Sequence, residues 1–187
     1  MKKIAFIITL VMVFSLPILA WADWDIRFFG INVNDFEDRH WAPVILGGVS
    51  SYVVHEMGHY AAGELTGMDA GFKWDSGPYV WADNYADKSD NAKRLYHGGG
   101  FLAQTLVGSI LTAVPYTRHS DFAVGFTGFS MANATMYGIT GGRPGMNKEY
   151  SDVRNLDELG WNGTGFALGN GALNGVLLYI NLNKSDK

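Results

Sequence analysis

The chain has 187 residues, enough for one domain of ordinary size, and it contains no cysteine, which excludes disulfide bonds, thiolate metal sites and cysteine nucleophiles. Its formal net charge is −4, from 14 Lys and Arg against 18 Asp and Glu, and the basic residues form no block. This balance argues against nucleic acid as a partner. Glycine is abundant, with 24 residues that cluster in the apolar segments, a pattern typical of closely packed membrane helices.

The N-terminus has the pattern of an export signal. Two lysines follow Met1, residues 4–19 are almost wholly apolar, and Ala20-Trp21-Ala22 places small residues at the cleavage-critical positions. We interpret residues 1–22 as a signal peptide, with an uncleaved signal anchor as the alternative. Residues 23–187 then form a single domain, which either form of the signal would deliver to a membrane.

Four apolar blocks follow the acidic segment 23–40, and each has about the ~20 residues that a helix needs to cross a bilayer core. Apart from one His-Glu-His motif, none has a charged residue in its middle. The pattern predicts an all-α membrane protein with Gly-rich helix packing, polar loops on the active-site side and about four transmembrane helices, near residues 41–65, 98–116, 122–140 and 163–182.

The predicted location is the inner (plasma) membrane, crossed several times, with the lipid bilayer as a partner. The mean hydropathy of the chain is close to zero, which counts against this prediction. A compact periplasmic or otherwise exported protein with Gly-rich buried helices is the alternative. The sequence indicates no particular oligomeric state.

The first apolar block contains His55-Glu56-x-x-His59. Positions i and i+4 lie on one face of a helix, so both imidazoles can point at one ion. Two neutral imidazoles suit Zn²⁺, and a third protein ligand would leave one position open for water. Glu56 could accept a proton as that water attacks a carbonyl. The alternative is a structural pair of histidines bonded to carbonyls, but three ionisable groups within five residues of an apolar helix favour a metal.

The third ligand must come from another segment. His55 and His59 lie in the second half of their helix, and two further helices return the chain to that same end. The segment that begins there offers four acidic residues: Glu149, Asp152, Asp157 and Glu158. We select Asp152, because it follows a Gly-Pro-rich entry and precedes the last helix. A helix N-cap is the alternative role for Asp152 and the favoured role for Asp157.

These features resemble the site-2 protease family of intramembrane zinc metalloproteases. His55, Glu56 and His59 match the family's H-E-x-x-H motif, and residues 98–104, GGGFLAQ, resemble the Gly-rich start of its next core helix. A segment with Asn133, Pro144 and Asp152 resembles the region that supplies an aspartate ligand. The resemblance covers about residues 41–160.

The resemblance implies a zinc metalloendopeptidase that hydrolyses peptide bonds of membrane-protein or peptide substrates. Glu56 would be its general base, and His55, His59 and Asp152 would hold Zn²⁺. Two other functions remain compatible with the same residues. One is a non-enzymatic metal-binding membrane protein, and the other is a soluble periplasmic zinc hydrolase.

Overall fold

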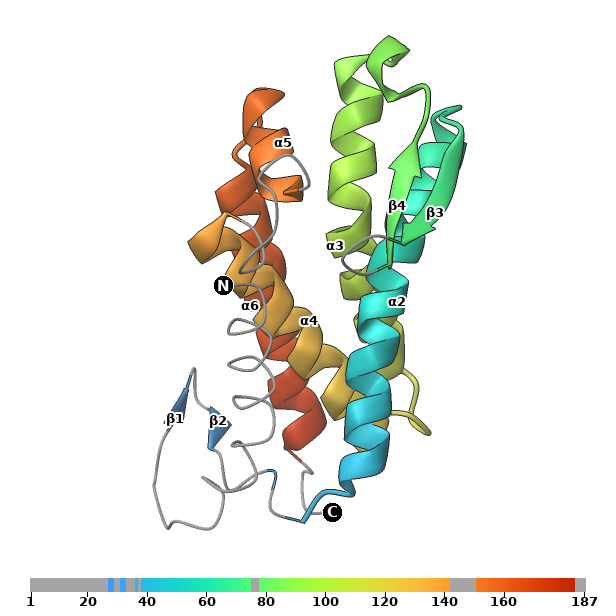
Figure 1. The fold of residues 1–187 in the computed structure, drawn as a ribbon. Coiled ribbons are helices and arrows are strands. Elements are labelled where there is room, and N and C mark those ends of the chain that lie inside the picture. The colour runs from blue at the N-terminus through green and yellow to red at the C-terminus, as the bar shows by residue number, and fades with distance from the viewer. Residues whose placement is uncertain are drawn as a thin grey trace, which may run out of the picture.

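The computed structural model describes residues 27–28, 31–32, 36, 38–74, 78–141 and 151–183, so the predicted signal at residues 1–22 lies outside the described residues. Its long elements are four helices that form a bundle (Figure 1): α2 (Trp41–Leu65), α3 (Asp90–Ala113), α4 (Asp121–Thr140) and α6 (Gly163–Leu182). The shorter elements are β1 (Arg27–Phe28), β2 (Ile31–Asn32), β3 (Ala70–Trp74), β4 (Pro78–Ala82), the 3-10 helix η2 (Tyr85–Asp87) and α5 (Asp152–Glu158).

Polar N-caps start most of the helices. The side chains of Ser89, Ser120, Ser151 and Asn162 each accept a hydrogen bond from the backbone N–H three residues later, at the first turns of α3, α4, α5 and α6. The C-cap of helix α4 is Gly141, whose φ of 69° is readily adopted by glycine. The Ser89 cap places the start of α3 at Asp90, eight residues before the predicted start at residue 98. His97 therefore lies within α3.

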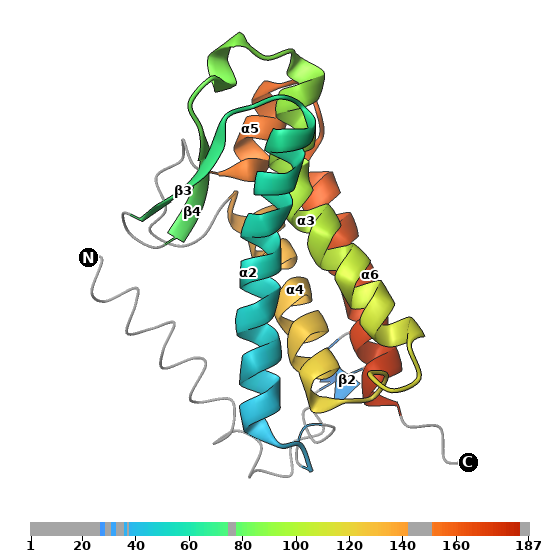
Figure 2. The same cartoon turned by 90° about the vertical axis from the view of Figure 1, so that its right-hand side faces the viewer.

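Helices α2 and α3 cross where glycines face each other. A Cβ on Gly58 would lie 2.4 Å from the carbonyl oxygen of Gly99, and a Cβ on Gly99 would lie 2.6 Å from that of Gly58. No side chain fits at either position, so the two backbones are in contact. Helix α2 also packs on α4, and α4 packs on α6. Figure 2 shows the bundle turned by 90°, with the β3–β4 hairpin beside α2.

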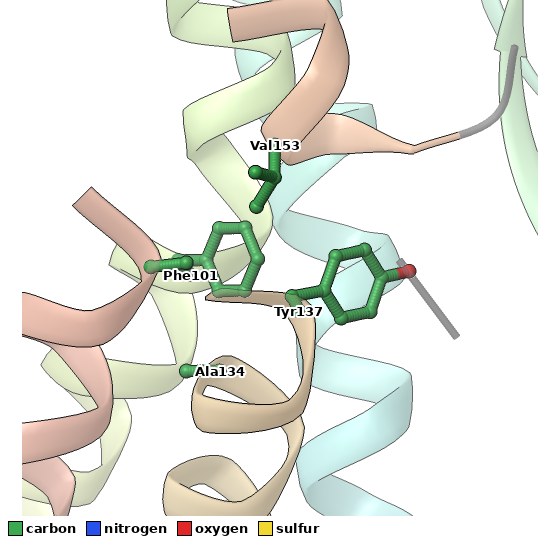
Figure 3. Packing of buried hydrophobic residues seen from close by; sticks show 5 residues of the cluster. Phe101, Ala134, Tyr137 and Val153 are labelled. Atoms are coloured by element: carbon green, nitrogen blue, oxygen red, sulfur yellow. The ribbon is translucent and has the colours of Figure 1, made fainter. Parts of the chain in front are cut away.

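The short helix α5 is held against the bundle by apolar contacts. Val153 packs with Phe101 of α3 and with Ala134 and Tyr137 of α4, and all four are at most 1% exposed (Figure 3). Arg94 of α3 donates hydrogen bonds to the carbonyl oxygen of Leu159 at the other end of α5. The first turn of α5 is thereby fixed against α3 and α4.

The burial pattern of the bundle places small and polar side chains inside. The buried residues of α2 include Gly47, Ser51, His55 and His59, and those of α6 include three asparagines. The outer face of α2 is aliphatic, and five of its side chains are 45–59% exposed: Ile45, Leu46, Val49, Val53 and Met57. Exposed apolar surface on this scale is typical of a face that contacts another apolar surface.

The predicted class of transmembrane protein is wrong for the helices that can be tested. Among the described residues, no helix combines the length and the apolarity needed to cross a membrane. The prediction equated absence of charge with apolarity, whereas Gly, Ser, Thr and Asn occupy many positions of these helices. The multi-pass inner-membrane location loses its basis with these helices, and the structure does not support the periplasmic alternative either.

Candidate metal centre

Three side chains that could hold a metal ion meet between α2, α3 and α5. His55 and His59 come from the middle and second half of α2, and Asp152 is the first residue of α5. All three are buried, and one ligand atom from each lies within 4.8 Å of the others. The structure thus brings together the three residues that the sequence analysis selected as metal ligands.

The distances among the three ligand atoms suit one tetrahedral ion. The two Nε2 atoms of His55 and His59 are 3.1 Å apart. Oδ2 of Asp152 lies 3.4 Å from the Nε2 of His55 and 3.3 Å from that of His59. Around a tetrahedral Zn²⁺ with bonds of about 2.0–2.1 Å, neighbouring ligand atoms stand about 3.3 Å apart. The triangle therefore matches one face of a zinc coordination tetrahedron.

Both histidines are held by hydrogen bonds at their other ring nitrogen. Nδ1 of His55 lies 3.2 Å from Oε1 of Gln104, and Nδ1 of His59 lies 2.7 Å from the backbone oxygen of Tyr96. Gln104 is oriented in turn, because its Nε2 donates to the backbone oxygen and the hydroxyl of Ser51. A carbonyl acceptor at Nδ1 requires Nδ1 to carry the proton, which leaves the lone pair of Nε2 for a metal.

Gly100 of α3 makes room for the two imidazoles. A Cβ at this position would lie 2.6 Å from Cε1 of His55 and 2.6 Å from Nε2 of His59. At Gly98, on the same helix, a Cβ would meet only the ring of Phe166, at 3.4 Å. Two nearby glycines of α3 therefore differ in their surroundings: Gly100 lies against the two imidazoles, and Gly98 lies away from them.

We expect Gly100→Ala to lower zinc affinity at least tenfold, because the added methyl group must displace a ligand imidazole that hydrogen bonds hold in place. The matched control is Gly98→Ala, which should bind zinc like the unmodified protein. Alanine also favours a helix interior by about 1 kcal/mol over glycine, so the control should not unfold. Competition with a chromophoric chelator measures the affinity. Equal affinities for the two variants would show that Gly100 does not border the metal.

Asp157, another of the four acidic residues considered for the third ligand, has a different role. Its Oδ1 accepts a hydrogen bond of 2.7 Å from the backbone N–H of Gly163, the first residue of α6. It therefore stabilises the start of a helix, although the N-cap position itself is Asn162. Ser151, not Asp152, is the N-cap of α5. Glu158 pairs with Arg154 at the surface, and Glu149 lies outside the described residues.

The ionisation states of His55, His59 and Asp152 depend on one another. Burial lowers the pKa of His55, so its imidazole is neutral near pH 7. Burial also acts to lower the pKa of His59, but the carboxylate of Asp152 outweighs it and raises that pKa to about 9. Burial acts to raise the pKa of Asp152, but His59, His55 and His97 hold it well below its ordinary range. Without metal, one proton on His59 therefore balances an ionised Asp152.

This proton predicts how zinc affinity at the candidate site should depend on pH. Zinc binds only the neutral imidazole, so below pH 9 each ion must displace one proton from His59. We expect the apparent zinc affinity to rise about tenfold per pH unit between about pH 6.5 and 8, and to level off above about pH 9. Chelator competition at several pH values measures the slope. An affinity that does not change over this range would contradict the assignment of His59 as a ligand.

Glu56 lies beside the first histidine and is also buried. Its Oε2 accepts a hydrogen bond of 3.3 Å from the backbone N–H of Val80 in β4. The backbone carbonyl oxygen of Val80 also accepts a hydrogen bond of 2.8 Å, from the hydroxyl of Tyr96. The hairpin is thereby attached to α2 and α3 beside the candidate metal ligands. The charge of Glu56 acts to raise the pKa of both histidines, although burial outweighs this effect at His55.

Sequence reasoning missed the contribution of α3 to the site. Gln104, Tyr96 and His97 each contact one of the three ligands, yet none was selected. For Tyr96 and His97, the missing information was the start of the helix at Asp90, because the predicted helix began at residue 98. With that start, positions 97, 100 and 104 fall on one helical face, and a His-Gly-Gln face opposite an H-E-x-x-H helix would have been a signal. Asn133, part of the resemblance, lies near the same network, with its Nδ2 3.5 Å from Oε1 of Gln104.

Taken together, these contacts define a buried two-histidine, one-aspartate centre of the kind that binds a metal ion. Comparisons of the chain with protein-family models, with curated proteins and with solved structures found no match. No relative therefore tests the resemblance to the site-2 protease family.

Proposed function

We propose that this protein is a zinc-dependent peptidase of the H-E-x-x-H type, with His55, His59 and Asp152 as the metal ligands. The single observation that carries the proposal is the ligand triangle, whose sides of 3.1, 3.3 and 3.4 Å fit zinc while its histidines are held in the ligating tautomer. Two histidines, one carboxylate and an open fourth position are typical of catalytic rather than structural zinc.

The roles of the residues follow from their positions. Zinc bound there would supply a Lewis acid that polarises a carbonyl and acidifies a water in the open position. Glu56 would accept a proton from the attacking water, and the N–H of Val80 holds one of its carboxylate oxygens in place. Gln104 and the backbone of Tyr96 keep the two imidazoles in the ligating tautomer. The choice of peptides as substrates rests on the motif and on the family resemblance.

A competing proposal is a protein that binds metal without catalysis. The hydrogen bond from Val80 to Glu56 also suits this function, because a buried glutamate can serve only to attach the hairpin. The two functions share the metal ligands and differ in the role of Glu56. Metal content alone cannot separate them, whereas metal content combined with a cleavage assay does.

The test uses the full chain, stripped of metal with a chelator and reloaded with Zn²⁺. The protein is incubated with a mixed peptide library, and new termini are identified by mass spectrometry. We expect one zinc ion per chain and cleavage that appears only after reloading. One bound zinc without cleavage would favour the non-enzymatic function, and absence of bound zinc would overturn both.

A further inference from the structure

His97 is a buried histidine next to the candidate metal centre, and it has no role in the proposed peptidase function. It lies on α3, three residues before Gly100, and its Nδ1 is 3.2 Å from Oδ1 of Asp152. Its Nε2 is 2.9 Å from the hydroxyl of Tyr85, in the 3-10 helix η2. His97 therefore joins a ligand carboxylate to a tyrosine that lies outside the bundle helices.

The two oxygens of Asp152 have different partners. Oδ2 faces the Nε2 atoms of His55 and His59, whereas Oδ1 is paired with His97. A carboxylate can bind a metal through one oxygen or through both. If both oxygens of Asp152 bound zinc, the ion would have four protein contacts, and the position needed for water would be filled. The contact of His97 with Oδ1 therefore affects whether the fourth coordination position stays available for water.

Tyr85 fixes the ring of His97. When His97 is neutral and donates from Nδ1 to Asp152, its Nε2 is an acceptor, and the hydroxyl of Tyr85 is placed to donate to it. The tyrosine is itself held, because Nζ of Lys93 lies 5.2 Å from the centre of its ring and the ring of Tyr96 packs against it edge-on. Tyr85, His97 and Asp152 form a continuous chain that ends at the metal centre.

The contact between His97 and Asp152 is not needed to hold α5 in place. Val153 and Leu156 of α5 are fully buried, and Arg94 separately connects α3 to Leu159 at the end of α5. The other two ligands also have one partner each from α3, Gln104 for His55 and the backbone of Tyr96 for His59. His97 completes this set, since it is the α3 partner of the third ligand.

We propose that His97, oriented by Tyr85, is a positioning residue that restricts Asp152 to binding the metal through Oδ2 alone. The inference rests on the proposed metal site. It identifies the Tyr85–His97 pair as the feature that keeps the fourth coordination position open. Loss of the pair should therefore change the coordination geometry as well as the affinity for metal.

The experiment compares His97→Leu, which removes the donor, with His97→Asn, whose amide nitrogen can take the place of Nδ1. Zinc affinity is measured by chelator competition, and coordination is measured by the visible absorption of the Co²⁺-loaded protein, which weakens as the coordination number rises. We expect His97→Leu to lower zinc affinity by about 10–100-fold and to weaken the Co²⁺ absorption. His97→Asn should retain both properties, and Tyr85→Phe should fall between the two.

The control is Arg94→Met, which removes the hydrogen bonds from α3 to the carbonyl oxygen of Leu159 at the end of α5. It should lower the melting temperature and leave the Co²⁺ spectrum unchanged. If His97→Leu matches the unmodified protein in affinity and spectrum, the role of His97 is refuted while the metal site stands. If His97→Leu and Arg94→Met weaken binding equally and His97→Asn does not restore it, docking of α5 explains the effect and the inference fails. An unmodified protein that binds neither ion refutes the proposed function, and the inference with it.

Discussion

Glu56→Gln should keep its zinc and lose peptidase activity by about 10²–10⁴-fold, the usual contribution of a general base. The amide has nearly the shape of the carboxylate, and its oxygen can still accept the hydrogen bond from Val80. It cannot accept a proton from the attacking water. The change therefore removes the proposed chemistry while the hairpin stays attached. The measurement is cleavage rate together with zinc content for the same preparation.

The matched control for this prediction is Glu64→Gln on the same helix. Glu64 is exposed and accepts a hydrogen bond from the backbone N–H of Ala70, so its loss should leave the cleavage rate within about twofold, as is usual for surface substitutions. If Glu56→Gln kept full activity, Glu56 would not be the base. If it lost zinc along with activity, Glu56 would instead act on the metal ligands.

Asp152→Ala should abolish stoichiometric zinc binding, whereas Asp157→Ala should not affect it. Removal of Asp152 leaves two histidines, and the loss of affinity should exceed the ~10–100-fold cost of losing an outer partner. Removal of Asp157 frees the N–H of Gly163 at the start of α6, which should cost about 0.5–2 kcal/mol of stability. Zinc content and urea unfolding of both variants measure the two effects.

The contrast is sharp because both aspartates belong to α5, five residues apart. Zinc loss in Asp157→Ala with zinc retained in Asp152→Ala would reverse the ligand assignment. Retention of zinc by both variants would mean that this segment supplies no carboxylate ligand. His55→Ala and His59→Ala should behave like Asp152→Ala, since each removes one corner of the same triangle.

Much of the helical framework, and the group of three buried residues that could hold a metal ion, could be predicted from the sequence. The long uncharged runs correspond to helices, and α2 covers Trp41–Leu65, the range expected. The spacing of His55 and His59 places both on one helical face. Asp152 could be reached by following the path of the chain, because two helices after α2 return it to the same end of the bundle (Figure 1).

Other features depend on interactions that a linear pattern does not reveal. The start of α3 is set by the Ser89 cap in a polar segment, and that start is needed to place His97 within the helix and on its site-facing side. The tight fit at Gly100 depends on the side chains of another helix. The transmembrane assignment was wrong because a lack of charge was taken for apolarity in helices rich in Gly, Ser, Thr and Asn.

Anomalous diffraction at the zinc absorption edge, from crystals of the protein grown with one equivalent of Zn²⁺, tests the metal centre most directly. We predict one anomalous peak per chain, bonded at about 2.0–2.2 Å to Nε2 of His55, Nε2 of His59 and Oδ2 of Asp152. Oδ1 of Asp152 should remain paired with His97 rather than with the ion. A peak at any other group of residues, or zinc-loaded crystals with no ordered peak, would contradict the account.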